Sequence, residues 1–192
     1  YNSWGLYVSN TIDQMVIIGT KSIPIVILTS FFTGMVSSVQ AGYQMESSIT
    51  PKWIVGSLVG ETMLLELAPV ITCLVLAGRI GATIAAEIGT MRVTEQIDAL
   101  GTLGTRPMQY LIAPKVIAAV ICIPFLVMIG NTIGILGGYV VAVMVIGVDE
   151  GAFWSQMQAN VDFRYDIVNG VIKSLVFGVA CTTIALFEGF DA

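Results

Sequence analysis

The sequence contains no histidine, and only 11% of its 192 residues are charged. Because imidazole is missing, imidazole-based catalysis and histidine-ligated metal sites are excluded. Soluble domains usually carry about 25% charged residues, so the low charge indicates a membrane protein. The net charge of −5 says little about partners, and the few basic residues form no run that would indicate nucleic acid binding.

Motifs for other chemistries are missing as well. The three cysteines, Cys73, Cys122 and Cys181, lie in apolar stretches, where they serve more often as small apolar residues than as a disulfide framework. Residues 19–22, Gly-Thr-Lys-Ser, lack the spacing of a phosphate-binding loop, and no nucleophile elbow or zinc-protease motif occurs. We therefore predict no catalytic residue, no metal site and no cofactor, so any ATP hydrolysis belongs to a partner.

Long apolar runs dominate what is present. Residues 22–45 and 116–148 contain no charged side chain, and each exceeds the length of about 20 residues that crosses a bilayer as a helix. Two further stretches are mainly apolar but contain internal charges. The alternating segments of a membrane β-barrel do not occur. The sequence therefore predicts an all-α, polytopic transmembrane protein with a single transmembrane domain over residues 1–192. Its spans are expected at about 17–41, 52–80, 111–147 and 165–187.

The residue at which the first span begins is not decided by the sequence. Residues 1–16 are mildly amphipathic, which fits either an interfacial helix or the first turns of the span. Pro24 is expected to kink the helix that follows. The third span would be about 50 Å long as a helix, so we expect it to be tilted, kinked at Pro124 or the glycines, or projecting from the membrane.

Residues 82–110, between the second and third spans, form a polar segment of mixed charge. This segment and its ends hold half of the eight basic residues, namely Arg79, Arg92, Arg106 and Lys115. An excess of Lys and Arg near span ends marks the cytoplasmic side of a membrane. We therefore expect a cytosolic element that docks a soluble partner, although a merely solvated polar face would show the same charges.

The docking segment is expected to contain two short helices separated by Gly89-Thr90. In the second helix an apolar stripe recurs at i, i+4 and i+7, formed by Val93, Ile97 and Leu100. Gly101 would end that helix. On the opposite side of the membrane, residues 149–163 predict an external amphipathic helix, whose apolar side is formed by Phe153, Trp154, Met157 and Val161.

Small residues recur at every fourth position in several spans, as in Gly56-x-x-x-Gly60 and Gly130-x-x-x-Gly134. This spacing lets helix backbones approach closely. Close helix packing is the simplest explanation, and a substrate path or a subunit interface is the alternative. The pattern alone does not separate these explanations.

Three charged residues, Glu61, Glu66 and Lys173, fall inside predicted spans. A charge at a helix centre costs about 2.5–3.5 kcal/mol on insertion scales, so such residues normally face a bundle interior or a wet cavity. At 1.5 Å per residue, Glu61 lies about 13 Å from the outer edge, Glu66 about 21 Å and Lys173 about 12 Å. Depth therefore favours a Glu61–Lys173 pair and leaves Glu66 facing a cavity or another subunit. A structural ion pair and a polar spot in a substrate pocket are both open.

The stretch from Glu66 to Ala118, which begins ELAPVITCLVLAGRIGATIAAEIGTMRVTEQIDALG, resembles the signature of the MlaE/YrbE permease family, as does FWSQMQANVDFRYDIVNGVIKSLVFG. The resemblance covers nearly the whole chain. It implies a membrane subunit of an ABC-type lipid transporter in a bacterial inner membrane or the chloroplast inner envelope. Family members have a fifth span and a longer N-terminal interfacial helix, so we expect these residues to be part of a longer protein that does not transport on its own.

The resemblance also implies partners and site residues. Members work as a homodimer, with cytosolic ATPase subunits beneath, an external MCE-domain protein above and phospholipid in a cavity between the permeases. The family's coupling helix falls on residues 85–100, where the expected ATPase contacts are Glu87, Gly89, Arg92, Glu95 and Asp98. The expected lipid-cavity residues are Glu66, which takes the place of the family's pocket acid, and Tyr43, Gln40, Glu61 and Lys173.

Two other classes of function are weighed against this one. An ion-coupled secondary transporter would use the charges at Glu61, Glu66 and Lys173, but such transporters commonly show paired halves, and no convincing repeat relates residues 1–96 to 97–192. A membrane scaffold would use residues 82–110 to recruit partners and would not respond to substitution of Glu66 or Lys173.

Overall fold

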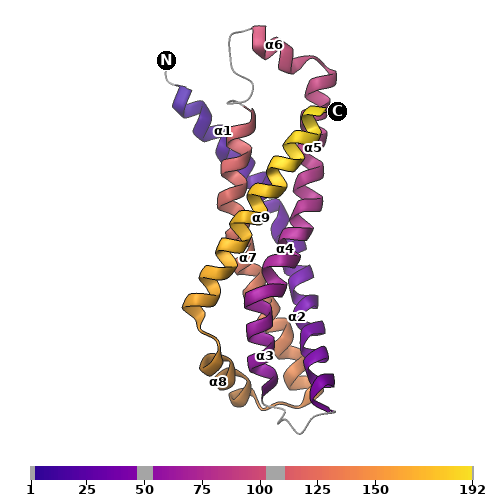
Figure 1. Cartoon of the computed structure of the whole chain (residues 1–192), viewed down its shortest axis with the longest axis vertical. Helices are drawn as coiled ribbons and strands as arrows, with labels where there is room; N and C mark the ends of the chain where they lie inside the picture. Colours follow the sequence, from indigo (N-terminus) through magenta and orange to yellow (C-terminus); the bar gives the residue numbers. More distant parts are fainter. Residues whose placement is uncertain (1–2, 47–53, 103–110, 192) are drawn as a thin grey trace. The chain divides into compact units, whose positions relative to one another are not determined.

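The computed structural model describes residues 3–46, 54–102 and 111–191. Within these ranges the regular structure is helical (Figure 1). Four helical segments in this part of the chain are long and apolar enough to cross a membrane: Tyr7–Met45, Val55–Val93, Ala113–Ile146 and Arg164–Gly189. The prediction of an all-α, polytopic membrane protein is therefore confirmed, and each observed segment contains most of the corresponding predicted span.

The first apolar segment is interrupted just before Pro24. Helix α1 (Ser3–Ile18) is followed by the 3-10 turn η1 (Thr20–Ser22) and by α2 (Ile23–Glu46). Pro24 is the second residue of α2, a position where its missing N–H costs no intrahelical hydrogen bond. The expected change of direction at this proline is thus a short 3-10 turn on its N-terminal side.

The second segment continues without a loop from the membrane into the polar stretch. It comprises α3 (Val55–Thr62), the π-helical turn η3 (Met63–Leu67), α4 (Ala68–Leu76), a second π-helical turn η4 (Ala77–Gly81) and α5 (Ala82–Val93). Its 39 residues would extend about 58 Å at 1.5 Å per residue. Because a bilayer core is only about 30 Å thick, a segment of this length projects well beyond it.

The prediction of a helix break at Gly89-Thr90 is wrong. Helix α5 runs through both residues and ends at Val93, and α6 (Gln96–Thr102) follows. The break lies at Glu95, whose φ of 57° is left-handed. Thr94 Oγ1 donates to Thr90 O at 2.7 Å, and a single glycine within a helix costs too little to stop it. Because of this break, Val93 and Ile97 do not share one helical stripe.

The third segment comprises α7 (Ala113–Val141), with Pro124 inside it, and the π-helical turn η6 (Ala142–Ile146). Gly147 ends the segment with a φ of 74°, a conformation that glycine adopts without a steric cost. The last segment is α9 (Phe163–Asp191).

The predicted stop of the second helix in the docking segment is close to the observed one, since Gly101 lies one residue before the end of α6.

The external amphipathic helix is present as α8 (Glu150–Asn160). Asp149 caps its N-terminus by accepting a hydrogen bond from Ala152 N at 3.3 Å. Three residues of the predicted apolar side are buried, Phe153, Met157 and Val161. Trp154 is 36% exposed, because it lies at the edge of that side, where its ring contacts those of Phe153 and Tyr139.

The chain divides into two compact units. Unit 1 comprises Tyr1–Ile23, Cys73–Pro124 and Leu175–Ala192, and unit 2 comprises Pro24–Thr72 and Phe125–Ser174. The boundaries between the units fall within or at the ends of helices. The single domain expected over residues 1–192 stays a prediction.

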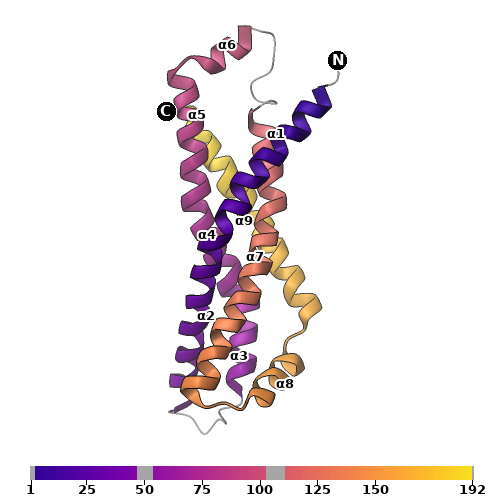
Figure 2. The same cartoon turned by 180° about the vertical axis from the view of Figure 1, so that it is seen from behind.

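Glycines hold the helices of unit 2 close together. In Figure 2, α2 and the second half of α7 lie side by side, and a Cβ added to Gly34 would meet Gly134 O at 1.8 Å. At the other edge of this unit, a Cβ on Gly56 would meet Phe153 O of α8 at 2.6 Å. The small-residue patterns containing Gly56 and Gly134 therefore serve close backbone packing.

Unit 1 is packed in the same way. A Cβ added to Gly189 would lie 3.1 Å from Ala85 Cα, which places the end of α9 directly against α5, as both views of the fold show. Gly19, next to η1, packs against Cys122 of α7. The Cys122 Sγ also donates to Met15 O at 3.6 Å, and all three cysteines are free thiols.

Candidate functional site

Unit 2 contains an open groove between α2 and the α3–α4 segment, with a volume of about 510 Å³. Its lining includes apolar side chains, among them Phe32, Val36 and Leu58, as well as amide and hydroxyl groups. The polar lining residues are Thr33, Ser37, Gln40, Gln44 and Thr62. A groove with both kinds of surface fits an amphiphile better than an ion or a small polar solute, since ligand sites are mostly apolar with a few placed polar groups.

Of the residues predicted to line the lipid cavity, Gln40 lies in this groove, whereas Tyr43 does not. Tyr43 is 69% exposed and lines a second groove of about 320 Å³, together with Val39, Val145 and Ile146. The two residues lie three positions apart on α2 but border different depressions of the same unit. The family resemblance assigned both to one cavity because they belong to the same matching stretch.

Glu66 lies on the π-helical turn η3, next to the groove residue Leu67. Its side chain is exposed, and it forms no ion pair or hydrogen bond with any residue that the structure describes. Glu61, one turn earlier on α3, is half-buried and likewise has no partner among the described residues. An unpaired carboxylate on an apolar segment is costly in a bilayer, so Glu66 needs either water or a ligand beside it.

Lys173 does not pair with Glu61, so that prediction is wrong. Its Nζ donates instead to the backbone oxygen of Leu65 at 2.6 Å. Pro69, four residues after Leu65, has no N–H to offer this oxygen, as a helix would normally require. Lys173 therefore supplies a donor to a carbonyl that the proline leaves without its usual partner, which is the way proline is tolerated in membrane helices. Pro69 in the sequence indicates that one backbone oxygen of this helix lacks its usual donor, but the sequence does not show that Lys173 supplies that donor.

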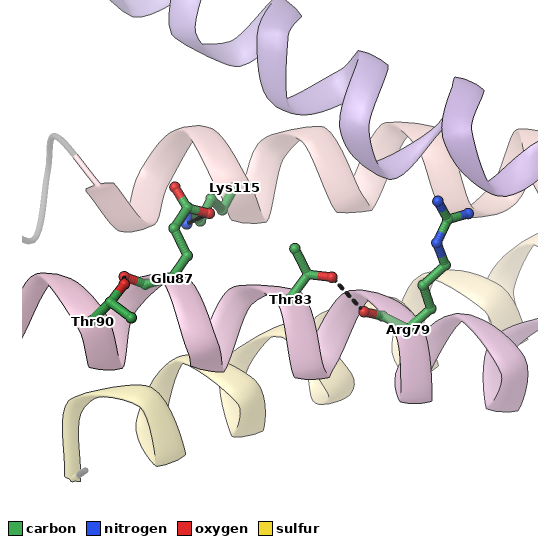
Figure 3. A network of polar contacts seen from close by, with 5 residues as sticks. All are labelled: Arg79, Thr83, Glu87, Thr90 and Lys115. Atoms are coloured by element: carbon green, nitrogen blue, oxygen red, sulfur yellow. Dashed lines mark hydrogen bonds and ion pairs between the residues drawn. The ribbon is translucent and has the colours of Figure 1, made fainter.

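A second cluster lies in unit 1, on the segment predicted to be cytosolic (Figure 3). Glu87 Oε2 of α5 and Lys115 Nζ of α7 form an ion pair at 2.6 Å. The Lys115 side chain is only 2% exposed, whereas that of Glu87 is 37% exposed. Glu87 was expected to contact an ATPase. In the structure its carboxylate pairs with Lys115 of the same chain, because a buried ammonium group needs a paired carboxylate. In the sequence, Lys115 was considered only as one of the basic residues that mark the cytoplasmic side of the membrane.

The same face of the second segment carries further polar contacts. Thr83 Oγ1 donates to Arg79 O at 2.8 Å, and Thr90 Oγ1 donates to Glu87 O at 2.9 Å. The Arg79 guanidinium donates to the backbone oxygen of Lys21 in η1. Arg79 and Lys115 therefore tie this segment to α7 and to the η1 turn of the same unit.

The remaining predicted coupling residues lie around the end of α5. Gly89 is inside α5, Arg92 is exposed in its last turn, and Glu95 is exposed in the left-handed conformation that ends the helix. Glu95 N donates to Arg92 O at 3.0 Å, a bond typical of such helix ends. Asp98 lies in α6, and its side chain is outside the described residues, as is Arg106.

The four long apolar helical segments in the described part of the chain define a polytopic helical membrane protein. A family model described as "Permease MlaE" matches residues 11–192. The chain therefore belongs to the MlaE permease family, as the sequence resemblance implied.

Individual relatives agree with this assignment. The chain is 44% identical over 180 residues to the intermembrane phospholipid transport system permease protein MlaE of Haemophilus influenzae, covering 94% of this chain and 69% of that protein. It is 42% identical over 189 residues to a probable ABC transporter permease protein of Rickettsia prowazekii, covering 96% and 71%. It is also 36% identical over 180 residues to the chloroplastic protein TRIGALACTOSYLDIACYLGLYCEROL 1 of Arabidopsis thaliana, covering 94% and 51%. The Haemophilus and Rickettsia relatives are named as transport permeases, which favours an ABC permease over an ion-coupled transporter.

Proposed function

We propose that this chain is the permease subunit of an ABC-type transporter that moves phospholipid, energised by ATP hydrolysis in a separate cytosolic subunit. The observation that carries the proposal is the groove of unit 2, which is lined by apolar side chains together with amide and hydroxyl groups, next to the unpaired Glu66. Membership in the permease family and the phospholipid transport named for the Haemophilus relative support the choice of substrate. The chain itself carries no nucleotide-binding motif.

A second copy of the permease is proposed to complete the groove. Along α2 the exposed apolar side chains recur every fourth residue, with Leu28, Phe32 and Val36 more than half exposed. This stripe borders the groove, since Phe32 and Val36 also line it. Two copies that meet along α2 would convert two open grooves into one enclosed cavity large enough for a lipid with two chains.

The ATPase is proposed to dock on the end of α5 and on α6. Arg92 and Glu95 are exposed there, and the helix that ends at Val93 is continuous with the turn that carries Glu66. A displacement at α5 would therefore act on the groove through one uninterrupted helical segment. The opposite, external side, which includes α8, is proposed to meet an MCE-domain protein that receives or delivers the lipid.

The proposal is tested with the complete permease reconstituted in liposomes with its ATPase subunit, by following transfer of a fluorescent phospholipid. We expect transfer to require ATP and to fall about tenfold in Gln40→Leu, which removes an amide from the groove lining, and in Glu66→Gln, which removes the negative charge next to it. Asn169→Leu is the matched control, since Asn169 is an exposed amide of α9 outside the groove. Transfer driven by an ion gradient without ATP would overturn the proposal in favour of a secondary transporter.

A further inference from the structure

Unit 1 contains a polar pocket that the proposed transport function does not use. It lies between the α1–η1 elbow and the η4–α5 segment and has a volume of about 160 Å³. Its lining includes Gln14, Lys21, Ser22, Arg79, Thr83 and Glu87. A water molecule occupies about 30 Å³ of liquid, so the pocket has room for a group of about five heavy atoms, such as a phosphate.

One buried hydroxyl group of this pocket lacks a partner. Ser22 is completely buried, and its Oγ forms no hydrogen bond with the described residues. Buried side-chain hydroxyls are nearly always hydrogen-bonded, because an unsatisfied one keeps its full desolvation cost. A serine at this position is therefore expected to donate to something that occupies the pocket.

The charges that line the pocket are positive in excess. Lys21 is exposed at its rim, and the Arg79 guanidinium uses one N–H on the Lys21 carbonyl and keeps others free. The Glu87 carboxylate is already neutralised by Lys115 at 2.6 Å. Asp13, the nearby acid of α1, does not line the pocket. Two cations and a hydroxyl donor thus face the same small space, which suits an anion with several oxygen atoms.

The surroundings of the pocket indicate where such an anion comes from. Helix α1 exposes Val8, Ile12 and Val16 by 56%, 53% and 47%, which places them in one stripe at every fourth residue. Such a stripe fits an interfacial helix as well as the first turns of a membrane span, and either one brings α1 beside lipid. Lys21 and Arg79 belong to apolar segments that are long enough to cross a membrane. The anions that accompany a lipid surface are the headgroup phosphates, so we take a lipid as the source.

We propose that this pocket binds the phosphate of a phospholipid headgroup from the surrounding leaflet, held by Lys21, Ser22 and Arg79. The lipid bound here is not the one in the groove of unit 2, since the two sites share no residue. It ties the α1–η1 elbow to η4 and so stabilises the membrane-facing side of unit 1. The proposal does not depend on transport activity.

The test uses the complete permease in detergent and measures binding through the rise in melting temperature. The probes are short-chain phosphatidic acid, the matching short-chain diacylglycerol, and inorganic phosphate. We expect phosphatidic acid to stabilise the protein, diacylglycerol to have no effect, and inorganic phosphate to act only weakly. Lys21→Gln and Ser22→Ala should each raise the apparent Kd for phosphatidic acid about tenfold, whereas Arg164→Gln, which removes an exposed charge in unit 2, should not.

Each result decides a part of the proposal. Because the Ser22 hydroxyl is buried without a partner in the described structure, Ser22→Ala should leave the melting temperature of the ligand-free protein unchanged or raise it, so a loss of binding there cannot be ascribed to misfolding. Equal affinity for inorganic phosphate and phosphatidic acid would overturn the lipid as the source of the phosphate. Unchanged binding of phosphatidic acid in both Lys21→Gln and Ser22→Ala would overturn the site itself.

Discussion

Lys173 and Pro69 are linked through a single oxygen atom, the Leu65 carbonyl, to which Lys173 donates at 2.6 Å in place of the N–H that Pro69 lacks. The charged side chain of Lys173, which lies in an apolar helix, therefore stabilises the backbone of a neighbouring helix. This explains why Lys173 does not form the pair with Glu61 that its depth along the helix predicted. Its further contribution to a lipid cavity stays a prediction, since Lys173 lines neither groove of unit 2.

This relationship predicts a double-mutant cycle. Lys173→Met should lower the free energy of unfolding by about 1–3 kcal/mol, because the Leu65 carbonyl loses its donor in an apolar environment. Pro69→Ala restores an N–H four residues after Leu65, so the loss should be much smaller in the Pro69→Ala background. The measurement is unfolding of each variant in mixed micelles, with Ile172→Met as the exposed neighbouring control. Equal costs of Lys173→Met in both backgrounds would contradict the relationship.

The ion pair between Glu87 and Lys115 predicts an asymmetry. Lys115 is 2% exposed and Glu87 is 37% exposed, so Glu87→Ala leaves a buried cation unpaired and should cost about 3–5 kcal/mol. Lys115→Met leaves a carboxylate that still reaches water, and its cost should be clearly smaller. Thermal unfolding of the two single variants and of the double variant measures this difference. The pair would be unimportant for folding if Glu87→Ala and Glu87→Gln melted at the wild-type temperature.

The left-handed conformation of Glu95 predicts a stabilising substitution. A residue with a side chain pays about 1–2 kcal/mol for a positive φ, and glycine does not. Glu95→Gly should therefore raise the melting temperature, while Gln96→Gly, one position later in α6, should lower it. Identical shifts for the two variants would show that the backbone at Glu95 is not strained in the way described.

The same residue should also affect partner binding. Reversing the charges at the start of α6, with Glu95→Lys and Asp98→Lys together, is expected to abolish binding of the ATPase while leaving the helical content unchanged. Co-purification of the two subunits from membranes is the readout, and circular dichroism checks the fold. Comparing this variant with Glu95→Gly separates the loss of the carboxylate from the change in backbone. Normal recovery of the ATPase with the double lysine variant would exclude this surface as the docking site.

Two glycines that look alike in sequence predict opposite effects. A Cβ on Gly34 would lie 1.8 Å from Gly134 O, whereas a Cβ on Gly78 has no atom within 4 Å. Gly34→Ala should therefore force the backbones of α2 and α7 apart and lower the melting temperature strongly. Gly78→Ala should be neutral or stabilise by up to about 1 kcal/mol, as alanine favours a helix. A similar response of both variants would refute the close approach at Gly34.

The sequence predicted those features that depend on composition and local pattern. The membrane segments, the external helix and its buried Phe153 and Met157 follow from apolar runs and helical spacing, and the tight approach at Gly56 follows from a small residue on a helix face. The break in the docking segment was misplaced, because Gly89 is the stronger local signal, whereas Glu95 takes up a conformation that residues other than glycine rarely adopt.

The candidate sites were less accessible for a different reason. Gln40 and Tyr43 border different grooves. Lys115 is distinguished from the other basic residues by its ion pair with Glu87 of α5. Such relationships depend on residues far apart in the chain, with separations of 28 positions for Glu87–Lys115 and 108 for Lys173–Leu65. No periodicity within one helix reports on them. The family resemblance supplied the function because it compares the whole chain at once.

The π-helical turn η4 sets the rotational phase of everything that follows it in the second segment. A π-helical turn holds one residue more than the α-helical turn it replaces, and one residue corresponds to about 100° of rotation around a helix with 3.6 residues per turn. Deleting a single residue from Ala77–Gly81 would therefore swing Glu87 about 100° away from Lys115, although no side chain of that pair had been altered. The position of Glu87 around the helix axis, and with it the pairing with Lys115, therefore depends on the extra residue that η4 contains.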